Sequence, residues 1–509
     1  MYKAYITALT NVRQHPNADR LLLADVFGNT ICISTDYFEG QVGIYFPTDG
    51  QLSVEFAEKN NLLRKKDDAG NNIGGYMDPD KRNVTAIRLR GEKSDGLFLP
   101  LSALNYCYAH NDASIELRMG DVIDGLVNGH EICCKYIPRS NTRVGRVTEG
   151  NRTRKKKAPT APLFKEHADT EQLAYNLGAF RVGDEVEITL KMHGTSQRTG
   201  YLPVHVGYKD STFRRIINKI IMGLKVRKGW GADGRNALYN SLKHGEPIYD
   251  YGYVSGTRRT VLENYDGGFY GNNVFRERHS KIFEGKLWKG ETVYYEVVGF
   301  TTSGQPIMAS ADNKKTQDKE FIKQYGKETV FSYGCLPNGL GRGEVWKEIY
   351  GSDPCGDRIF IDSPQSKIYV YRMTMTNPDG DMVEYTPDFM RYRCEQMGVK
   401  TVPVFAKGIV DAEGVYVYSP DDELYCLVHV GDCVGDTVKE IAEKYYDGPD
   451  PVGKTHVREG VVVRIINRPK FAAYKHKNHT FKVLSGIAIA AAEESGATDT
   501  MSEDILAEM

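Results

Sequence analysis

The 509-residue sequence has few cysteines, and their spacing excludes two common uses of this residue. There are nine cysteines, an odd number, and no two of them form a C-x-x-C pair. A disulfide framework normally uses an even number, and a structural zinc site usually contains closely spaced cysteine pairs. We therefore expect neither of them. We expect instead a reducing compartment, the cytoplasm, and buried core positions for Cys133 and Cys134.

Long apolar runs and an excess of one charge are also missing. The N-terminal residues lack the apolar stretch of a secretion signal, and no run is long enough to cross a bilayer. Lysine and arginine number 66 against 67 aspartates and glutamates, so the formal net charge is −1. Any nucleic-acid-binding surface must therefore come from local basic patches. The composition, 40% hydrophobic and 26% charged, is typical of a soluble protein of two to four domains.

Residues 1–137 read as short strands separated by turns, a spacing typical of a small barrel. The expected strands are Tyr2–Leu9, Leu21–Phe27, Asn29–Ser34, Gly43–Phe46, Val84–Leu89 and Glu131–Tyr136. The segments HPNADRL (15–21), VGIYFPTDGQL (42–52) and IRLRGEKSDGL (87–97) resemble the OB-fold module that binds tRNA in synthetase-associated proteins. The resemblance implies an OB-fold β-barrel domain that binds nucleic acid. Arg88, Arg90 and Lys93 either follow a phosphate backbone or form a solvated turn.

Two basic segments follow in the chain. Residues 138–164 contain eight lysines and arginines without periodicity, which predicts an exposed linker that either attracts phosphates or has no ligand. Ser211–Trp230 has apolar residues at helical spacing with basic residues around them. It predicts a basic amphipathic helix that either faces RNA phosphates or is only solvated. Residues 487–509 read as an acidic C-terminal tail.

Lys191 follows a predicted strand and precedes a glycine turn. Val186, Ile188 and Leu190 alternate with Glu187 and Thr189, the period of a half-buried strand, so Lys191 projects from its end. Nearby cations, a metal or partial burial can lower a lysine pKa and make the amine a nucleophile. Lys191 is therefore either a covalent catalyst or an ordinary lysine at a strand end.

Five later segments decide between these readings. KMHGTS (191–196) resembles the nucleotidyltransferase motif of ATP-dependent RNA ligases. The segments that resemble the later motifs of that family, in the same order, are TRRT (257–260), YYEVVG (294–299), KIYVYRM (367–373), EGVVVRI (459–465) and YKHKNHTFKVLSG (474–486). His193 stands where many relatives carry an acidic residue, and Ser196 stands where DNA ligases and capping enzymes often carry arginine. Both departures favour the RNA branch.

The resemblance implies an α+β fold class, with the OB-fold domain joined to a nucleotidyltransferase domain of antiparallel sheets and helices over residues 165–486. It implies that Lys191 is the nucleophile and His193 part of its motif, and that Arg259 reaches a phosphate. Glu296 would accept hydrogen bonds from the ribose hydroxyls of ATP. Either Tyr369 or Tyr371, on one strand face, would stack on adenine.

The last two motifs imply the phosphate and metal ligands. Glu459 would act on the metal and on Lys191, and two lysines would neutralise the α-phosphate. Lys477 and Lys482 are the choice for these two, with Lys475 in reserve.

A P-loop expression, GPDPVGKT (448–455), must be weighed separately. A phosphate-binding P-loop follows a strand and opens a helix. Here a helix-like segment (437–446) precedes the loop and a strand-like one follows it, and Pro449 and Pro451 remove backbone donors. We therefore expect no P-loop.

The sequence predicts an RNA ligase that uses ATP and Mg²⁺ or Mn²⁺ to join a 3′-hydroxyl and a 5′-phosphate of nicked or broken RNA, possibly tRNA. No membrane and no obligate protein partner are expected. The alternatives are a capping guanylyltransferase or a DNA ligase of the same superfamily, a non-catalytic OB-fold RNA-binding protein, and a P-loop kinase.

Overall fold

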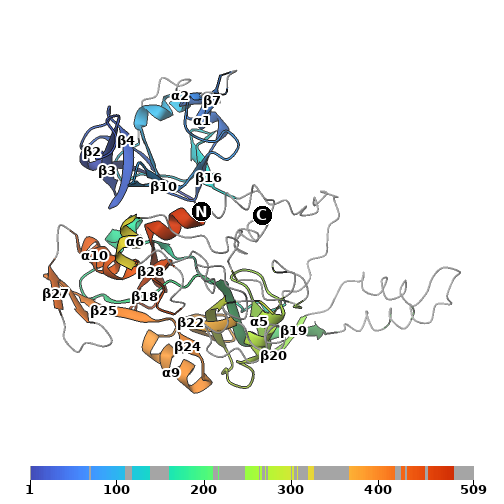
Figure 1. Cartoon of the computed structure of the whole chain (residues 1–509). Helices are drawn as coiled ribbons and strands as arrows, with labels where there is room; N and C mark the ends of the chain where they lie inside the picture. Colours follow the sequence, from blue (N-terminus) through green and yellow to red (C-terminus); the bar gives the residue numbers. More distant parts are fainter. Residues whose placement is uncertain are drawn as a thin grey trace, which may run out of the picture.

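The computed structural model of the chain contains two groups of antiparallel sheets (Figure 1). It describes residues 2–67, 70, 72–108, 117–137, 160–209, 247–262, 264–265, 273–299, 319–325, 366–418, 426–429, 433–452 and 457–486, with the single residues 216, 220, 270, 301, 302 and 307. The predicted linker before residue 160, the acidic tail and Lys454 lie outside these residues. So does the predicted 211–230 helix, except for Ile216 and Ile220, which are helical and more than half exposed.

The N-terminal group contains several small sheets. A four-stranded sheet has the order β12–β5–β1–β13, with bounds Leu97–Pro100, Val42–Phe46, Ala4–Ala8 and Val122–Ile123. Two three-stranded sheets are β2–β3–β4 (Thr10–Gln14, Leu21–Val26, Asn29–Ser34) and β16–β6–β9 (Cys133–Lys135, Gly50–Leu52, Asn83–Val84). The hairpins are β7–β8 (Lys65–Lys66, Asn72–Gly74), β10–β11 (Ala86–Leu89, Glu92–Asp95) and β14–β15 (Leu126–Val127, His130–Glu131). The short helices are α1 (Val54–Lys59), η1 (Leu101–Leu104) and α2 (Asn105–Tyr108).

The predicted N-terminal strands all contain strand residues of the structure, but the described strand pairings do not close into a barrel. The predicted burial of the adjacent residues Cys133 and Cys134 was correct for the first and wrong for the second. Cys133 is buried and Cys134 is exposed, because neighbouring residues of β16 point to opposite faces of the strand. Cys32, Cys107, Cys133, Cys134, Cys394 and Cys433 are free thiols.

Two larger sheets form the second group. The seven-stranded sheet has the order β17–β29–β28–β18–β25–β26–β27, with bounds Glu171–Gln172, Ala472–Lys477, Gly460–Ile465, Glu185–Leu190, Val404–Val410, Gly414–Tyr418 and Cys426–His429. The other sheet has the order β20–β19–β21–β22–β23, with bounds Pro247–Gly256, Thr195–Tyr208, Glu291–Gly299, Ser366–Thr376 and Met382–Glu384, and β24 (Lys400–Thr401) pairs with β22. The helical elements are η2 (Leu173–Tyr175), η3 (Leu177–Ala179), α5 (Val274–Lys281), α6 (Lys319–Tyr325), α9 (Pro387–Met397) and α10 (Val434–Tyr446).

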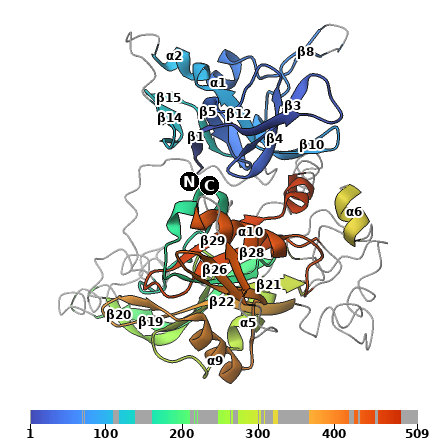
Figure 2. The same cartoon turned by 90° about the vertical axis from the view of Figure 1, so that its left-hand side faces the viewer.

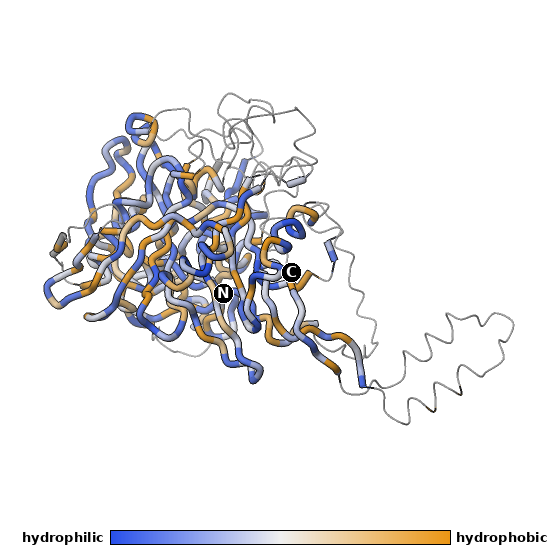
Figure 3. Tube along the Cα trace, turned by 90° about the horizontal axis from the view of Figure 1, so that it is seen from below, coloured by the Kyte–Doolittle hydropathy of each residue, from blue (hydrophilic) through white to orange (hydrophobic). Residues whose placement is uncertain are grey.

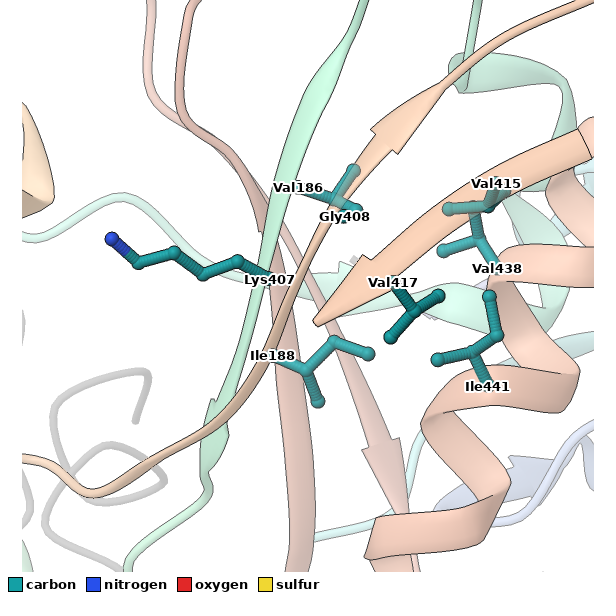
Figure 4. Close-up of a pocket in the computed structure, with 8 residues that line it drawn as sticks. All are labelled: Val186, Ile188, Lys407, Gly408, Val415, Val417, Val438 and Ile441. Atoms are coloured by element: carbon teal, nitrogen blue, oxygen red, sulfur yellow. The ribbon is translucent and has the colours of Figure 1, made fainter. Parts of the chain in front are cut away.

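Helix α10 covers one face of the seven-stranded sheet. Figure 4 shows Val438 and Ile441 of this helix facing Val186, Ile188 and other aliphatic side chains of the strands, whereas the Lys407 amine points away from them. The strand predicted up to Leu190 is confirmed, and Val186, Ile188 and Leu190 are buried; the strand is not half-buried, however, since Glu187 on its other face is buried as well. Figure 3 shows hydrophobic and hydrophilic residues interleaved along the trace of the chain. Among the described residues, no helix is long and apolar enough to cross a membrane.

The N-terminal sheets lie on one side of the second group, as Figures 1 and 2 both show. Tyr175 of η2 contacts three aromatic rings of the N-terminal sheets, with centroid distances of 4.7 Å to Tyr5, 5.3 Å to Phe27 and 6.2 Å to Tyr45. The helix α10 also touches this side, because a side chain added at Gly28 would meet the Lys439 amine. The two groups are therefore packed against each other.

Candidate nucleotide-binding site

Strand pairing brings Lys191 and Glu459 together. Strand β18 pairs antiparallel with β28, and its last residue, Leu190, lies opposite Val461. Lys191, the residue after β18, and Glu459 and Gly460, at the start of β28, therefore lie at the same end of the two paired strands. The Lys191 amide donates to the Gly460 carbonyl at 3.0 Å, and the Lys191 Nζ lies 2.7 Å from the Glu459 Oε1. Two segments 268 positions apart thus form one ion pair at the end of two central strands.

Glu459 is a buried carboxylate held between cations. The Lys477 Nζ lies 3.4 Å from the same Oε1 atom, because β29 pairs with β28 and places Lys477 opposite Gly460. Burial alone would raise the pKa of Glu459, but the charges of Lys191, Lys477 and His193 outweigh burial and lower it to about 2. Glu459 is therefore ionised at neutral pH, and it raises the pKa of Lys477 against the effect of that lysine's own burial.

Lys475 is a cation without enough compensating negative charge. It lies two residues before Lys477 on β29, opposite Val462, so both lysines emerge on the same face of the strand. Burial, followed by the charges of Lys477, Lys191 and Arg258, lowers the pKa of Lys475 to about 8. A surplus of positive charge in a half-buried position favours an anionic ligand such as a phosphate.

Lys482 is the predicted site residue that the structure does not bring into this cluster. It belongs to a helical segment at 479–486 that follows β29, and its Nζ donates to Asp95 of the N-terminal sheets at 2.5 Å. Strand β29 ends at Lys477, and the change to helical geometry turns Lys482 away from the strand face that carries Lys475 and Lys477. The reserve residue Lys475 takes the place expected for Lys482.

The TRRT segment contributes two arginines that share one acid. Arg258 and Arg259 each donate to Asp169, both at 3.0 Å and to different carboxylate oxygens. Arg258, not the predicted Arg259, lines the cavity described next. Both arginines are about one-quarter exposed, so both remain near the mouth of the site.

A cavity that is partly open to solvent has Lys191 in its lining. It lies between the two sheets, because its lining comes from strands of both of them. Its lining includes Glu296 of β21 and Tyr371 of β22, which the sequence had predicted. The lining also includes His167, Glu187, Arg258, Arg391 and Arg464.

The two candidate tyrosines differ in position. The Tyr371 hydroxyl lies 2.8 Å from the Ser196 hydroxyl, and its ring lines the cavity. Tyr369 is 5% exposed and packs in an apolar cluster with Leu190 and Met192, among others. Tyr371 is therefore the better placed of the two to contact a base.

His193, two residues after Lys191, is buried. Its ring packs edge-on against Phe481 with centroids 4.8 Å apart, and its charge contributes to the lowered pKa of Glu459. It does not belong to the cavity lining.

The cavity lining also contains titratable residues that the sequence did not indicate. Glu187 is 3% exposed and pairs with Arg391 of α9 at 2.9 Å. A polar residue in an alternating strand is expected to face solvent, but β18 is a central strand and both its faces are covered. His167, whose pKa burial and the nearby Arg372 charge lower, lies between Tyr371 and Tyr294 and had no sequence signal at all.

The site offers a metal few protein ligands. The described residues contain no group of three or more His, Cys, Asp or Glu side chains arranged to hold a metal ion. Glu459 is the acidic side chain next to Lys191 and Lys477. Magnesium is commonly bound through one or two carboxylates together with substrate phosphates and water. The donor set therefore fits a metal that arrives with a nucleotide.

Searches against protein-family models and against the curated proteins found no match to this chain. Among solved structures, variants of a Naegleria gruberi RNA ligase are similar to it. One with AMP and Mn is 15% identical, with 94% of this chain and 97% of that chain covered and a TM-score of 0.47. Another with ATP and Mn has the same identity and TM-score, with 94% and 98% covered. The enzyme with PPi is 14% identical, with 94% and 97% covered and a TM-score of 0.46. At this level of similarity, function has to be argued from the site itself.

Proposed function

We propose that the chain is an ATP-dependent RNA ligase that works through a covalent bond between Lys191 and AMP. The observation that carries the proposal is the contact of Lys191 with buried Glu459, next to a cavity that Lys191 lines and beside Lys475 and Lys477. Lys475 and Lys477 lie on β29, two strands from β18, and a purely structural role for Lys191 does not account for them, since like charges repel each other. An anionic ligand explains their presence.

The first step joins Lys191 to AMP. The Lys191 ammonium first releases a proton to water. Its neutral Nζ then attacks the α-phosphorus of ATP, a P–N bond forms, the bond from the α-phosphorus to the oxygen that bridges to the β-phosphate breaks, and pyrophosphate leaves with that oxygen. Glu459 holds the Lys191 amine in place at 2.7 Å. Lys475 and Lys477 stabilise the negative charge of the transferring group, which is the main protein contribution to phosphoryl and nucleotidyl transfer.

Nucleotide binding fits the rest of the cavity. Tyr371 would stack on the base and Glu296 would accept the ribose hydroxyls, since both line the cavity on neighbouring strands of one sheet. Arg258, with Arg259 beside it on Asp169, would reach a phosphate of ATP or of RNA. Glu459, together with phosphate oxygens, would hold Mg²⁺ or Mn²⁺, and the metal would neutralise charge at the reacting phosphate.

Two further steps complete the ligation. A 5′-phosphate oxygen of RNA attacks the phosphorus of the lysine-bound AMP, and the Lys191 amine leaves. A 3′-hydroxyl then attacks the activated 5′-phosphate, a phosphodiester forms, and AMP leaves. We further propose that residues 1–137 are an OB-fold-like domain that engages nicked or broken RNA, possibly tRNA, with Arg88, Arg90 and Lys93 as candidate phosphate contacts.

Incubation with α-labelled ATP or GTP and Mg²⁺, followed by a denaturing gel, tests the proposal. Label from ATP, and sealing of nicked RNA by the labelled protein, are the expected results. Label from GTP would favour a capping guanylyltransferase, and sealing of nicked DNA alone would favour a DNA ligase. A protein that takes no label from either nucleotide is not a ligase, and a non-catalytic RNA-binding role would replace this proposal.

A further inference from the structure

The helical segment at 479–486 lies between the N-terminal sheets and the nucleotide site. It is the red segment just below the blue N-terminal sheets in Figures 1 and 2. It begins two residues after Lys477, the last residue of β29. Any displacement of the segment is therefore passed directly to the strand that carries Lys475 and Lys477.

One side of this segment is attached to the N-terminal sheets through Asp95. Asp95 ends the β10–β11 hairpin and is only 6% exposed. Its Oδ2 atom accepts from the Lys482 Nζ and lies 4.0 Å from the His479 Nδ1. Both side chains come from the 479–486 segment and lie three residues apart, so one buried carboxylate contacts a single turn of it.

The other side of the segment reaches the nucleophile motif. Phe481, one residue before Lys482, packs edge-on against His193, with ring centroids 4.8 Å apart. His193 is two residues after Lys191. Asn478, at the junction with β29, donates its backbone amide to the Glu459 carbonyl at 2.9 Å. The segment therefore contacts the backbone or neighbours of both members of the Lys191–Glu459 pair.

A second attachment lies on the opposite edge of β29. Strand β17 pairs with β29 in parallel, with Gln172 opposite Lys475. Three residues later Tyr175 enters the aromatic group of Tyr5, Phe27 and Tyr45 in the N-terminal sheets. The N-terminal sheets thus hold β29 both through its edge partner and through its C-terminal continuation.

We propose that Asp95 is a positioning residue for nucleotide transfer. By holding Lys482 and His479, it fixes the 479–486 segment, and with it Lys475, Lys477 and the Lys191–His193 turn, in the arrangement that accepts ATP. Lys482 therefore acts through Asp95 and touches no phosphate. This inference rests on the proposed function for its kinetic readout, but the docking itself can be measured without any chemistry.

Exchanging the two charges separates this role from a phosphate contact. Asp95→Lys and Lys482→Asp should each slow covalent AMP labelling at saturating ATP by about tenfold or more, since each leaves like charges facing each other in a buried contact. The double variant Asp95→Lys/Lys482→Asp restores an opposite pair and should return to within about threefold of the wild-type rate. If Lys482 contacted phosphate, the double variant would stay as slow as Lys482→Asp, which would overturn the proposal.

Asp25→Asn is the matched control. Asp25 also lies in the N-terminal sheets, but it pairs with Arg13 at 3.2 Å and accepts from Asn11 and Thr30, all of which lie in the same sheet. It should label at the wild-type rate. An equal slowing in this control would mean that any loss of an N-terminal ion pair has the same effect, and Asp95 would have no positioning role.

Hydrogen exchange provides a readout independent of catalysis. Asp95→Asn, which is nearly isosteric, should increase exchange at the amides of 475–486 while leaving those of β18 protected. Unchanged protection of 475–486 in a folded Asp95→Asn protein contradicts the proposal. Failure of the wild-type protein to take AMP would instead refute the proposed function, and the exchange measurement would still decide whether Asp95 holds the segment.

Discussion

Replacing Lys475 by methionine should stabilise the folded protein while impairing the proposed reaction. The pKa of Lys475 is lowered from 10.5 to about 8 by burial and by the charges of Lys477, Lys191 and Arg258. A shift of this size corresponds to at most about 3 kcal/mol, because one pKa unit is worth about 1.4 kcal/mol. Below pH 8 the folded protein carries this whole cost, since Lys475 is then charged in both the folded and the unfolded state.

The pH dependence has a definite sign. Between about pH 8 and 10.5 the unfolded chain holds the Lys475 proton and the folded protein releases it, so the contribution of Lys475 to stability improves as pH rises. Lys475→Met lacks a titrating group here. The variant should therefore be more stable than the wild type by up to about 3 kcal/mol at pH 7, and this advantage should shrink above pH 8.

The protonation of Lys475 should also change when ATP binds. Phosphate charge favours protonated Lys475, so at pH 8 binding should take up as much as about half a proton, and at pH 6 almost none. Calorimetry in two buffers of different ionisation enthalpy measures this uptake. Lys470→Met removes an exposed lysine from the same part of the chain and is the control. Two results would refute this account of the site. One is equal proton uptake in Lys475→Met and wild type, and the other is a stability of Lys475→Met that is no higher than that of the wild type and of Lys470→Met.

Three other predictions concern neighbouring residues. Because the pKa of Glu459 is lowered to about 2, its contribution to stability is present above its ordinary value of 4.5 and is lost as pH falls toward 2; Glu459→Gln should lose that acid-side dependence in denaturant titrations and should also lose AMP labelling. Tyr371→Ala should weaken ATP binding with a small loss of stability, whereas buried Tyr369→Ala should cost about 3 kcal/mol of stability, and the opposite ranking in thermal melts and binding would exchange their roles. Lys454→Ala should label and seal within about a few-fold of wild type, since a helix precedes that loop and a strand follows it; loss of ATP binding there would revive the P-loop reading.

The strands around the site were predictable because their pattern is local. Alternation marked β18 up to Leu190, and Val293, Tyr295 and Val297 form one buried face of β21 as expected. The helix–loop–strand order around residues 448–455 was also predicted correctly, as α10 precedes the loop and β28 follows it. Period-two and period-3.6 patterns suffice for such statements.

The choice among similar side chains was not predictable. Lys475, Lys477 and Lys482 lie within eight residues, and only the end of β29 at Lys477 decides which of them share a face. Arg258 and Arg259 are adjacent, and their directions depend on a turn and on Asp169, which lies 89 positions from the first of them. Glu187 and Arg391 meet only because α9 packs near a central strand. Such contacts are set by tertiary packing, which a local pattern does not encode.

The attachment of the N-terminal sheets to β29 was likewise not foreseen. The sequence suggested two independent parts, one for RNA and one for the nucleotide. Asp95 and Tyr175 join them instead at the strand that carries Lys475 and Lys477. Because both attachments pair residues from distant parts of the chain, no short motif could reveal them.

We propose that Lys191 forms a covalent bond with AMP, and mass spectrometry of the protein after incubation with ATP and Mg²⁺, before and after proteolysis, is the decisive experiment. We expect one added AMP, located on the peptide that contains Lys191, and none on a folded Lys191→Ala variant. Covalent AMP on another residue, or undiminished labelling of folded Lys191→Ala, would contradict it.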